Sequence, residues 1–208
     1  MARLAALIVV AALLVGCGGE QPTRESQTVP EQKQPPAAAV ALSAPSPDEI
    51  AAVQEARKMR VEMETEKGAM LLELDGAAAP AAVANFLNLV EAGFYDGMPF
   101  HRVEAGFVIQ AGAPELVGRP PVSYTIPDER SPIAHERGVI AMARLYRGQH
   151  MLPNSASTQF YICLRPAPHL DEMGFTAFGR VAEGLDTIDL IAAGDNILRA
   201  SVLPPAEE

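Results

Sequence analysis

The chain has 208 residues, of which 49% are apolar and 20% charged, and its formal net charge at pH 7 is −10. This excess of acidic residues argues against binding to nucleic acid, which requires a basic surface, and against electrostatic adhesion to anionic lipid. The pattern of apolar residues divides the chain into an apolar start, a polar linker, a short helix and one domain that is long enough for a sizeable core.

The N-terminus resembles a secretion signal. Leu4 to Val15 is an uninterrupted apolar run, shorter than the roughly 20 residues of a membrane-spanning helix and typical of the apolar region of a signal peptide. It ends in LVGC, which is similar to the lipobox of bacterial lipoproteins, where the chain is cut before the cysteine. We expect residues 1–16 to be a lipoprotein signal peptide and acylated Cys17 to bind the lipid bilayer. An ordinary signal peptide with a chance cysteine is the alternative.

The residue after Cys17 bears on the expected location. By analogy with lipoprotein sorting in diderm bacteria, Gly18 at this position, rather than an aspartate, predicts the periplasmic face of the outer membrane. In a monoderm bacterium the same signal would place the protein on the outer face of the cell membrane. Either way, we expect a lipid-anchored protein of the bacterial cell envelope.

A polar linker separates the signal from the folded part. Residues 17–46 are rich in Gly, Gln, Pro, Ser, Thr and Ala, so they cannot bury enough apolar surface to fold and are predicted to be a disordered tether. Ser46, Pro47 and Glu49 then have the arrangement of a capping box with proline at the first helical position. This arrangement predicts a short helix over 47–58, and the sequence leaves open whether it docks on the domain.

Residues 59–205 form a predicted domain that is mainly β. Alternating apolar positions predict an antiparallel hairpin from Val61–Thr65 and Met70–Leu74, and helical spacing predicts helices over Pro80–Ala92 and Leu185–Ala193. Many short strands separated by turn signals, with few helices, indicate a closed antiparallel barrel. The further strands are predicted at Phe100–Val103, Phe107–Gln110, Val139–Ala143, Thr158–Cys163, Thr176–Val181 and Leu198–Leu203.

The stretch from Phe100 to Gly112 contains one arginine and one glutamine in an otherwise apolar, β-type run. Burying the guanidinium of Arg102 there without a partner would cost several kcal/mol. Arg102 therefore either lies on an outer face or lines a pocket in which its charge is used. Gln110 is likewise either an edge-strand amide that faces water or a residue of the same pocket.

Four segments of the domain resemble the signature blocks of the cyclophilins, a family of peptidyl-prolyl cis–trans isomerases. They are FHRVEAGFVIQAGAP from Phe100, HERGVIAMAR from His135, STQFYICL from Ser157, and HLD with FTAFGRV from His169. The segments occur in the order and spacing of the family. The resemblance implies an isomerase domain at 59–205 that is built as a closed eight-stranded antiparallel barrel capped by two helices.

The resemblance also implies the residues of the active site. Arg102 corresponds to the catalytic arginine, Gln110 to the glutamine that hydrogen-bonds the substrate and steadies the arginine, and Phe107 to the floor of the proline pocket. Strict alternation places Phe107 on the face opposite Val108 and Gln110. Phe107 can therefore join the pocket only if the strand bends or starts at Gly106; otherwise it is a core residue. The substrate-binding residues that the resemblance implies are Val108, Ala143, Arg144, Gln159, Tyr161, His169, Leu170 and Phe175.

The chemistry of the family requires no nucleophile, metal or cofactor. A guanidinium aimed at the amide nitrogen stabilises the twisted X–Pro bond electrostatically, so we expect no cofactor. The four histidines are scattered without the spacing of a metal site, and we expect no metal. Cys163 lies in the apolar run QFYICL and is expected to be a small buried hydrophobic residue rather than a nucleophile.

Three positions depart from the pattern of the family. His169 stands where many members have tryptophan, Arg144 where asparagine is usual, and Phe175 where histidine or tyrosine is frequent. The first departure predicts weakened binding of the cyclic peptide cyclosporin. The second is expected to matter less, because the substrate contact at Arg144 comes from the backbone.

Taken together, the sequence predicts a peptidyl-prolyl cis–trans isomerase that assists the folding of exported proteins. Its expected partners are proline-containing polypeptide clients and the lipid bilayer, without nucleic acid, and we expect a monomer. Two alternatives are a non-catalytic proline-peptide binding module or holdase of the cell envelope, and a purely structural lipoprotein. Retention of Arg102, Phe107 and Gln110 favours the enzyme, because binding alone would tolerate loss of the charge.

Overall fold

A computed structural model of the chain describes residues 42–204. The expected signal peptide at 1–16, the lipidation site Cys17 and most of the expected tether at 17–46 lie outside the described residues. No helix within the described range combines the length and the apolar character needed to cross a membrane.

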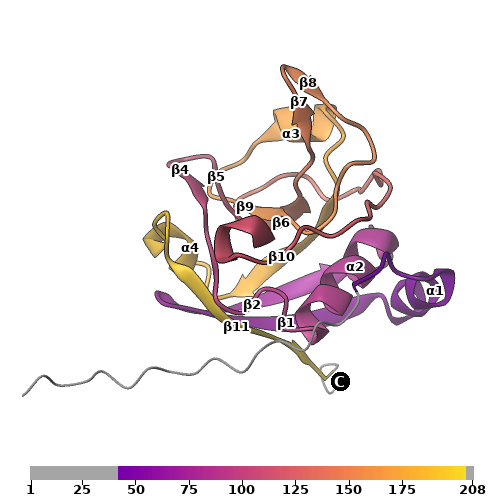
Figure 1. Ribbon diagram of the computed structural model, residues 1–208, viewed down its shortest axis with the longest axis horizontal. Coiled ribbons are helices and arrows are strands. Elements are labelled where there is room, and N and C mark those ends of the chain that lie inside the picture. The colour runs from indigo at the N-terminus through magenta and orange to yellow at the C-terminus, as the bar shows by residue number, and fades with distance from the viewer. Residues whose placement is uncertain (1–41, 205–208) are drawn as a thin grey trace, which may run out of the picture. The chain divides into compact units, whose positions relative to one another are not determined.

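Helix α1 (Pro47–Ala56) begins where the capping box predicts and ends two residues before the predicted end. The hydroxyl of Ser46 accepts from the N–H of Glu49 at 3.3 Å, and the carboxylate of Glu49 accepts from the N–H of Ser46 at 2.6 Å. The side chain of Asn88 in α2 (Pro80–Glu91) donates to the other carboxylate oxygen of Glu49 at 3.1 Å. The two helices lie side by side (Figure 1), so α1 is docked on the domain.

The domain is built on one curled antiparallel sheet of nine strands (Figure 1). A separate two-stranded sheet pairs β7 (Tyr146–Arg147) with β8 (His150–Met151). The predicted N-terminal hairpin is present, and it pairs Lys58 with Asp75 at one end and Thr65 with Gly68 at the other. In spatial order the nine strands are β3 (Met98–Pro99), β11 (Asn196–Leu203), β1 (Lys58–Thr65), β2 (Gly68–Asp75), β10 (Ala177–Glu183), β6 (Val139–Met142), β9 (Phe160–Cys163), β5 (Val108–Ala111) and β4 (Arg102–Glu104).

The mainly β class is confirmed, but the prediction of a closed barrel with eight strands is wrong. β3 and β4 are the two edges of the sheet, and within residues 42–204 no ladder joins them. The strand predicted at Phe100–Val103 is interrupted because Phe100 is fully buried and its N–H donates to the carbonyl of Asp195 at 2.9 Å. Phe100 and His101 therefore link β3 to β4 along the chain, but they do not continue the sheet from one edge to the other.

The described residues contain four α-helices where three were expected, together with one 3₁₀ turn, η1 (Pro114–Val117). The predicted helix at residues 80–92 is present as α2. The helix predicted over 185–193 is reduced to α4 (Thr187–Leu190), and the carboxylate of Asp195 accepts from the N–H of Ala192 at 2.7 Å in the turn that follows. The fourth helix, α3 (Pro168–Glu172), is too short to show helical periodicity in the sequence.

The sheet is buried on both faces where β5, β6 and β9 lie. Inside the curl, the ring of Phe86 in α2 contacts the rings of Tyr95, Phe160 and Phe178 at centroid distances of 5.1, 5.4 and 5.3 Å. A second, smaller cluster packs on the opposite face of these strands, and we call it the outer-face cluster. It consists of Val108, Val139, Ala141, Tyr161, Cys163, Ala167, Leu170, Phe175 and Ala177.

The alternation predicted for β9 is confirmed by these two clusters. Phe160 and Ile162 belong to the main core, whereas Tyr161 belongs to the outer-face cluster. Leu170 in α3 and Phe175 after it pack against the outer face. The sheet and this covering segment therefore provide two walls of the candidate site.

Candidate active site

The outer-face cluster borders a cavity of about 380 Å³, within the size range of small-molecule sites. Nine residues of the predicted site line this cavity, together with Tyr146, which was not predicted. The sheet and the segments that cover its outer face contribute to the lining. The lining residues are Arg102, Phe107, Val108, Gln110, Ala143, Arg144, Tyr146, Tyr161, Leu170 and Phe175.

Arg102, Gln110 and Phe107 converge at the cavity. Arg102 in β4 lies opposite Gln110 in β5 in the ladder, and its Nη1 donates to Oε1 of Gln110 at 3.4 Å. The guanidinium carbon of Arg102 lies 5.7 Å from the centroid of the Phe107 ring, within the range of a cation–π contact. The Arg102 side chain is 44% exposed, so its charge stands at the rim of the cavity and is not buried.

Glu104 is a second partner of Arg102, and it was not predicted. Its carboxylate accepts a hydrogen bond from Nη2 of Arg102, and the Glu104 side chain is 54% exposed. An ion pair this exposed contributes about 0–1 kcal/mol to stability. Gln110 donates in turn from Nε2 to Oε1 of Gln159 at 2.9 Å. A chain of hydrogen bonds therefore runs along the rim from Glu104 through Arg102 and Gln110 to Gln159.

Phe107 reaches the cavity because the chain turns before β5. Gly106 has φ +74°, in the left-handed region that glycine adopts readily, and the N–H of Phe107 donates to the carbonyl of Glu104 at 2.9 Å. β5 begins only at Val108. Phe107 is therefore a turn residue, and strand alternation does not force its side chain to the far face.

Two predicted site residues lie beside the cavity and not in its lining. Gln159 bonds to Gln110 and borders a separate shallow depression near Ala143 and Leu145. His169 is exposed in α3 and stacks on Phe107, with ring centroids 5.5 Å apart and an interplanar angle of 26°. His169 therefore supports the ring of Phe107 from outside the cavity.

Tyr161 is held by a network that the sequence did not reveal. Its hydroxyl oxygen lies 2.9 Å from Nε2 of the buried His135, and Nδ1 of His135 lies 2.6 Å from Oδ1 of Asp171. If Nδ1 carries the proton and donates it to the carboxylate, Nε2 can accept from the tyrosine hydroxyl. Burial raises the pKa of Tyr161 well above its ordinary value, so the hydroxyl stays protonated. The network fixes the aromatic wall of the cavity.

Cys163 lies two residues farther along β9, under the same cover. Burial, with a smaller contribution from the charge of Asp171, raises the pKa of its thiol to about 12. The thiol is therefore protonated at neutral pH and packs as a small apolar group. Within residues 42–204, no three His, Cys, Asp or Glu side chains are grouped in a way that could hold a metal ion.

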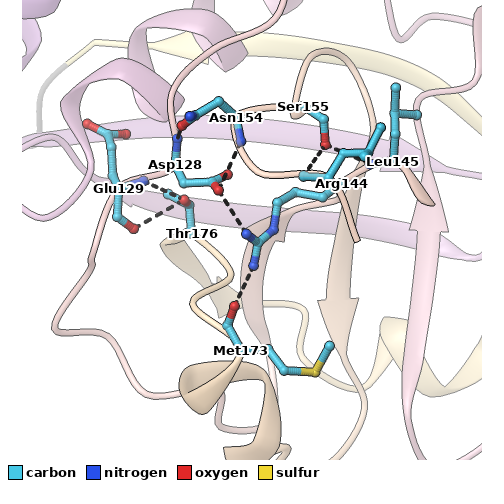
Figure 2. Close-up of polar contacts among 9 residues, drawn as sticks. Asp128, Glu129, Arg144, Leu145, Asn154, Ser155, Met173 and Thr176 are labelled. Carbon is cyan, nitrogen blue, oxygen red and sulfur yellow. Dashed lines mark hydrogen bonds and ion pairs between the residues drawn. The ribbon is translucent and has the colours of Figure 1, made fainter. Parts of the chain in front are cut away.

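Arg144 takes part through its side chain, although the resemblance implied a contact from its backbone. The side chain is only 6% exposed. Figure 2 shows its guanidinium between two acceptors: Nη1 donates to Oδ2 of Asp128 at 2.8 Å, and Nη2 donates to the carbonyl of Met173 at 2.7 Å. The guanidinium carbon also lies 4.4 Å from the centroid of the Phe175 ring. Arg144 therefore fixes the rim at Phe175.

Comparison with known proteins agrees with this geometry. The model of the family described as "Cyclophilin type peptidyl-prolyl cis-trans isomerase/CLD" matches residues 60–205, a range that includes every residue of the cavity lining. The chain belongs to the cyclophilin family. Membership confirms the family, and the isomerase class, that the four sequence blocks predict.

Two relatives of this cyclophilin match it over most of their length. It is 39% identical over 146 residues to a peptidyl-prolyl cis-trans isomerase of Synechococcus elongatus, which covers 69% of this chain and 96% of that relative. It is 42% identical over 125 residues to peptidyl-prolyl cis-trans isomerase B of Bacillus subtilis, which covers 59% of this chain and 82% of that relative.

A solved structure shares the fold of this cyclophilin. It is the cyclophilin-type peptidyl-prolyl cis-trans isomerase of Cryptosporidium parvum, determined in the presence of the dipeptide Ala-Pro. The two superimpose with a TM-score of 0.61 at 26% identity, covering 70% of this chain and 99% of that chain.

This cyclophilin also contains site residues that sequence reasoning missed. Tyr146 is an aromatic residue in a short polar hairpin, and that contrast was the one local signal that could have found it. Glu104 stands two residues from Arg102 on the same strand, so strand alternation could have placed the two side chains on one face. His135 and Asp171 lie within two of the four blocks, but their bonds join residues that are far apart in the sequence. Asp128 lies outside the blocks, and no local pattern marks it.

Proposed function

We propose that this cyclophilin accelerates rotation about X–Pro bonds by electrostatic stabilisation of the twisted amide. The barrier arises from amide resonance and is about 18–20 kcal/mol. In the twisted state the proline nitrogen becomes pyramidal and basic, so a positive charge beside it lowers the barrier without a covalent step. The observation that carries the proposal is the position of the Arg102 guanidinium at the cavity, bonded to Gln110 and close to the Phe107 ring.

The remaining lining suits a proline-containing peptide. Phe107, Leu170 and Tyr161 offer apolar surface for the proline ring. Neither the N–H nor the C=O of Arg144 pairs with the backbone of another residue in the described part of the chain, so both groups can pair with the backbone of a bound peptide as with an added strand. Arg102 remains charged at any physiological pH, and its planar fork can serve Gln110 while it faces the substrate.

We further propose that the isomerase acts as a lipid-anchored monomer of the cell envelope on exported polypeptides. The apolar run at residues 4–15 and the LVGC tetrapeptide support acylation of Cys17, and Gly18 supports the periplasmic face of the outer membrane. Uncatalysed X–Pro isomerisation takes tens to hundreds of seconds, which would delay the folding of exported clients. Labelling cells with tagged palmitate tests the anchor: label on the wild-type chain and none on Cys17→Ser is expected, and an unlabelled wild-type chain would contradict it.

The catalytic proposal is tested by following the cis-to-trans relaxation of an Ala-Pro peptide. We expect the full chain to accelerate relaxation and Arg102→Ala to lower kcat/KM by roughly 100- to 1000-fold, the effect of removing one preorganised electrostatic donor. Arg180→Ala is the matched control, because Arg180 is an exposed arginine paired with Glu73 outside the cavity lining. This control should retain the wild-type rate.

Peptide affinity measured on the same proteins separates the enzyme from the alternative functions. A wild-type chain that binds the peptide without accelerating relaxation would be a proline-peptide binding module or holdase. A chain that neither binds nor accelerates would fit a structural lipoprotein. Equal acceleration by wild type and Arg102→Ala would retain the isomerase but remove Arg102 from its mechanism.

A further inference from the structure

The β7–β8 hairpin contributes an unexpected residue to the cavity. Tyr146 in β7 lines the cavity although it is 54% exposed. An aromatic side chain that borders a site and is still half exposed has surface available for contact with a bound molecule. The hairpin therefore presents an aromatic ring to the cavity from outside the curled sheet.

The base of the hairpin is pinned by hydrogen bonds. The N–H of Leu152 donates to the carbonyl of Leu145 at 2.9 Å. The hydroxyl of the buried Ser155 accepts from the N–H of Leu145 at 2.9 Å and donates to the carbonyl of Leu152 at 2.6 Å. These bonds close the segment that carries Tyr146 into a defined loop.

Asp128 ties both ends of this loop to a neighbouring segment. Its Oδ2 accepts from Nη1 of Arg144 at 2.8 Å and from the N–H of Asn154 at 3.0 Å (Figure 2). Asn154 returns the contact, because its Oδ1 accepts from the N–H of Asp128 at 2.9 Å. Asn154 has φ +51°, a conformation that asparagine tolerates better than most residues. One carboxylate therefore anchors the residues that flank the hairpin on either side.

Arg144 links the hairpin to the opposite part of the rim. Its guanidinium bonds to Asp128 and to the carbonyl of Met173, and it stacks on the ring of Phe175. Because Asp128 pairs with its charge, Arg144 does not present a free cation at the rim, where Tyr146 and Phe175 offer aromatic surface. The aromatic rings of Tyr146 and Phe175 suit contact with an apolar side chain.

We propose that the β7–β8 hairpin is a specificity element in which Tyr146 contacts an apolar side chain next to the proline of a client. In this proposal Arg144 is a positioning residue that holds Tyr146 and Phe175 at the rim. The inference rests on the proposed function, because it assigns a substrate preference to the same cavity. It does not involve the chemistry at Arg102.

The test compares two peptide series with the full chain and with Tyr146→Ala. In one series the residue before proline is Ala, Leu or Phe, and in the other the residue after proline is varied in the same way. The series whose varied residue contacts Tyr146 should respond to its removal. In that series Tyr146→Ala should raise KM for the Leu and Phe peptides by roughly three- to tenfold, the size of one aromatic contact. The change in KM should be smaller for the Ala peptide than for the Leu and Phe peptides, and Tyr146→Phe should retain the wild-type preference.

Leu198→Ala is the matched control, because Leu198 is a 53% exposed apolar residue on β11, outside the cavity lining. Arg144→Lys tests the positioning role, since an ammonium lacks the planar fork that reaches both Asp128 and Met173. Arg144→Lys should therefore lose the preference for the Leu and Phe peptides over the Ala peptide. If Arg144→Lys fails to fold, as judged by circular dichroism, Asp128→Asn takes its place.

Two outcomes overturn the inference: Tyr146→Ala changes KM for no peptide, or it changes KM equally for all peptides. Wild-type selectivity in both Arg144→Lys and Asp128→Asn overturns the positioning role. Peptide affinities measured by titration keep this test separate from the proposed function. If the wild-type chain binds peptides but does not accelerate relaxation, the isomerase mechanism fails, and the affinities still show whether selectivity depends on Tyr146.

Discussion

Arg102 carries the proposed chemistry, but its charge is not isolated. Gln110 and Glu104 both accept hydrogen bonds from its guanidinium. The glutamine is neutral and only orients the group, whereas the carboxylate also offsets part of the positive potential at the cavity. Because Arg102 and Glu104 are both about half exposed, water and salt screen this offset and keep it small.

Replacement of the carboxylate should therefore make the site slightly more effective. We expect Glu104→Gln to raise kcat/KM for an uncharged Ala-Pro peptide about two- to threefold at low ionic strength, and the gain to vanish near 1 M salt, where the Debye length is about 3 Å. Relaxation rates measured across a salt series check this. Glu73→Gln, which removes the carboxylate partner of Arg180 outside the cavity lining, is the control. A lower rate at every salt concentration would mean that Glu104 orients Arg102.

Among single residues, the resemblance predicted the site side chains that lie within one signature block. It missed a side chain that reaches the site from a loop outside the blocks. Arg102, Phe107 and Gln110 lie within one block, and the structure brings them together at the cavity. Asp128 meets Arg144 from a loop outside the four blocks. Such a pairing depends on the tertiary path of two loops, which neither propensity nor spacing specifies.

Among the elements, α2 depends on a distant residue for its N-terminus. Its N-cap residue is Ala79, which has no side chain that could satisfy the first N–H groups. The two carboxylate oxygens of Glu129 accept instead from the N–H groups of Ala81 and Ala82, each at 2.9 Å. Glu129 is also tied to the sheet, because its N–H donates to the hydroxyl of Thr176 at 2.9 Å.

Removal of this remote cap should destabilise the domain. We expect Glu129→Ala to lower the free energy of unfolding by about 1–2 kcal/mol, the upper part of the range for loss of an N-cap. Urea denaturation compared with Glu55→Ala, an exposed carboxylate in α1, measures the difference. Equal stability of the two variants would show that water satisfies the N-terminus of α2 as well as Glu129 does.

The strands and their faces were easier to predict than whether the sheet closes into a barrel. Alternation placed Phe160 and Tyr161 on opposite faces, and both placements are confirmed. The barrel prediction failed because the strand is interrupted at the buried Phe100, so β3 and β4 are separate strands at the two edges of an open sheet. Whether an aromatic residue continues a ladder or turns into the core depends on the neighbouring chain, here the carbonyl of Asp195.

In the domain as a whole, we expect the segments around the cavity to differ in their local stability against opening. β6 and β9 lie inside the sheet and all their residues are buried. β4, which carries Arg102, is an edge strand of three residues, and β7 and β8 form a separate sheet of two residues each. Opening free energies within a domain range from near zero in such exposed segments to the global value in its core.

Amide hydrogen exchange should therefore show a gradient across the cavity. We expect the amides of β6 and β9 to exchange only through global unfolding, with opening free energies that follow urea concentration with the global slope. Amides of β7 and β8 should exchange through local opening, with little dependence on urea. Equal protection in β7 and β9 would contradict this gradient. The contrast matters for the proposed specificity element, because Tyr161 would lie on a rigid wall of the cavity whereas Tyr146 would lie on a segment that opens locally.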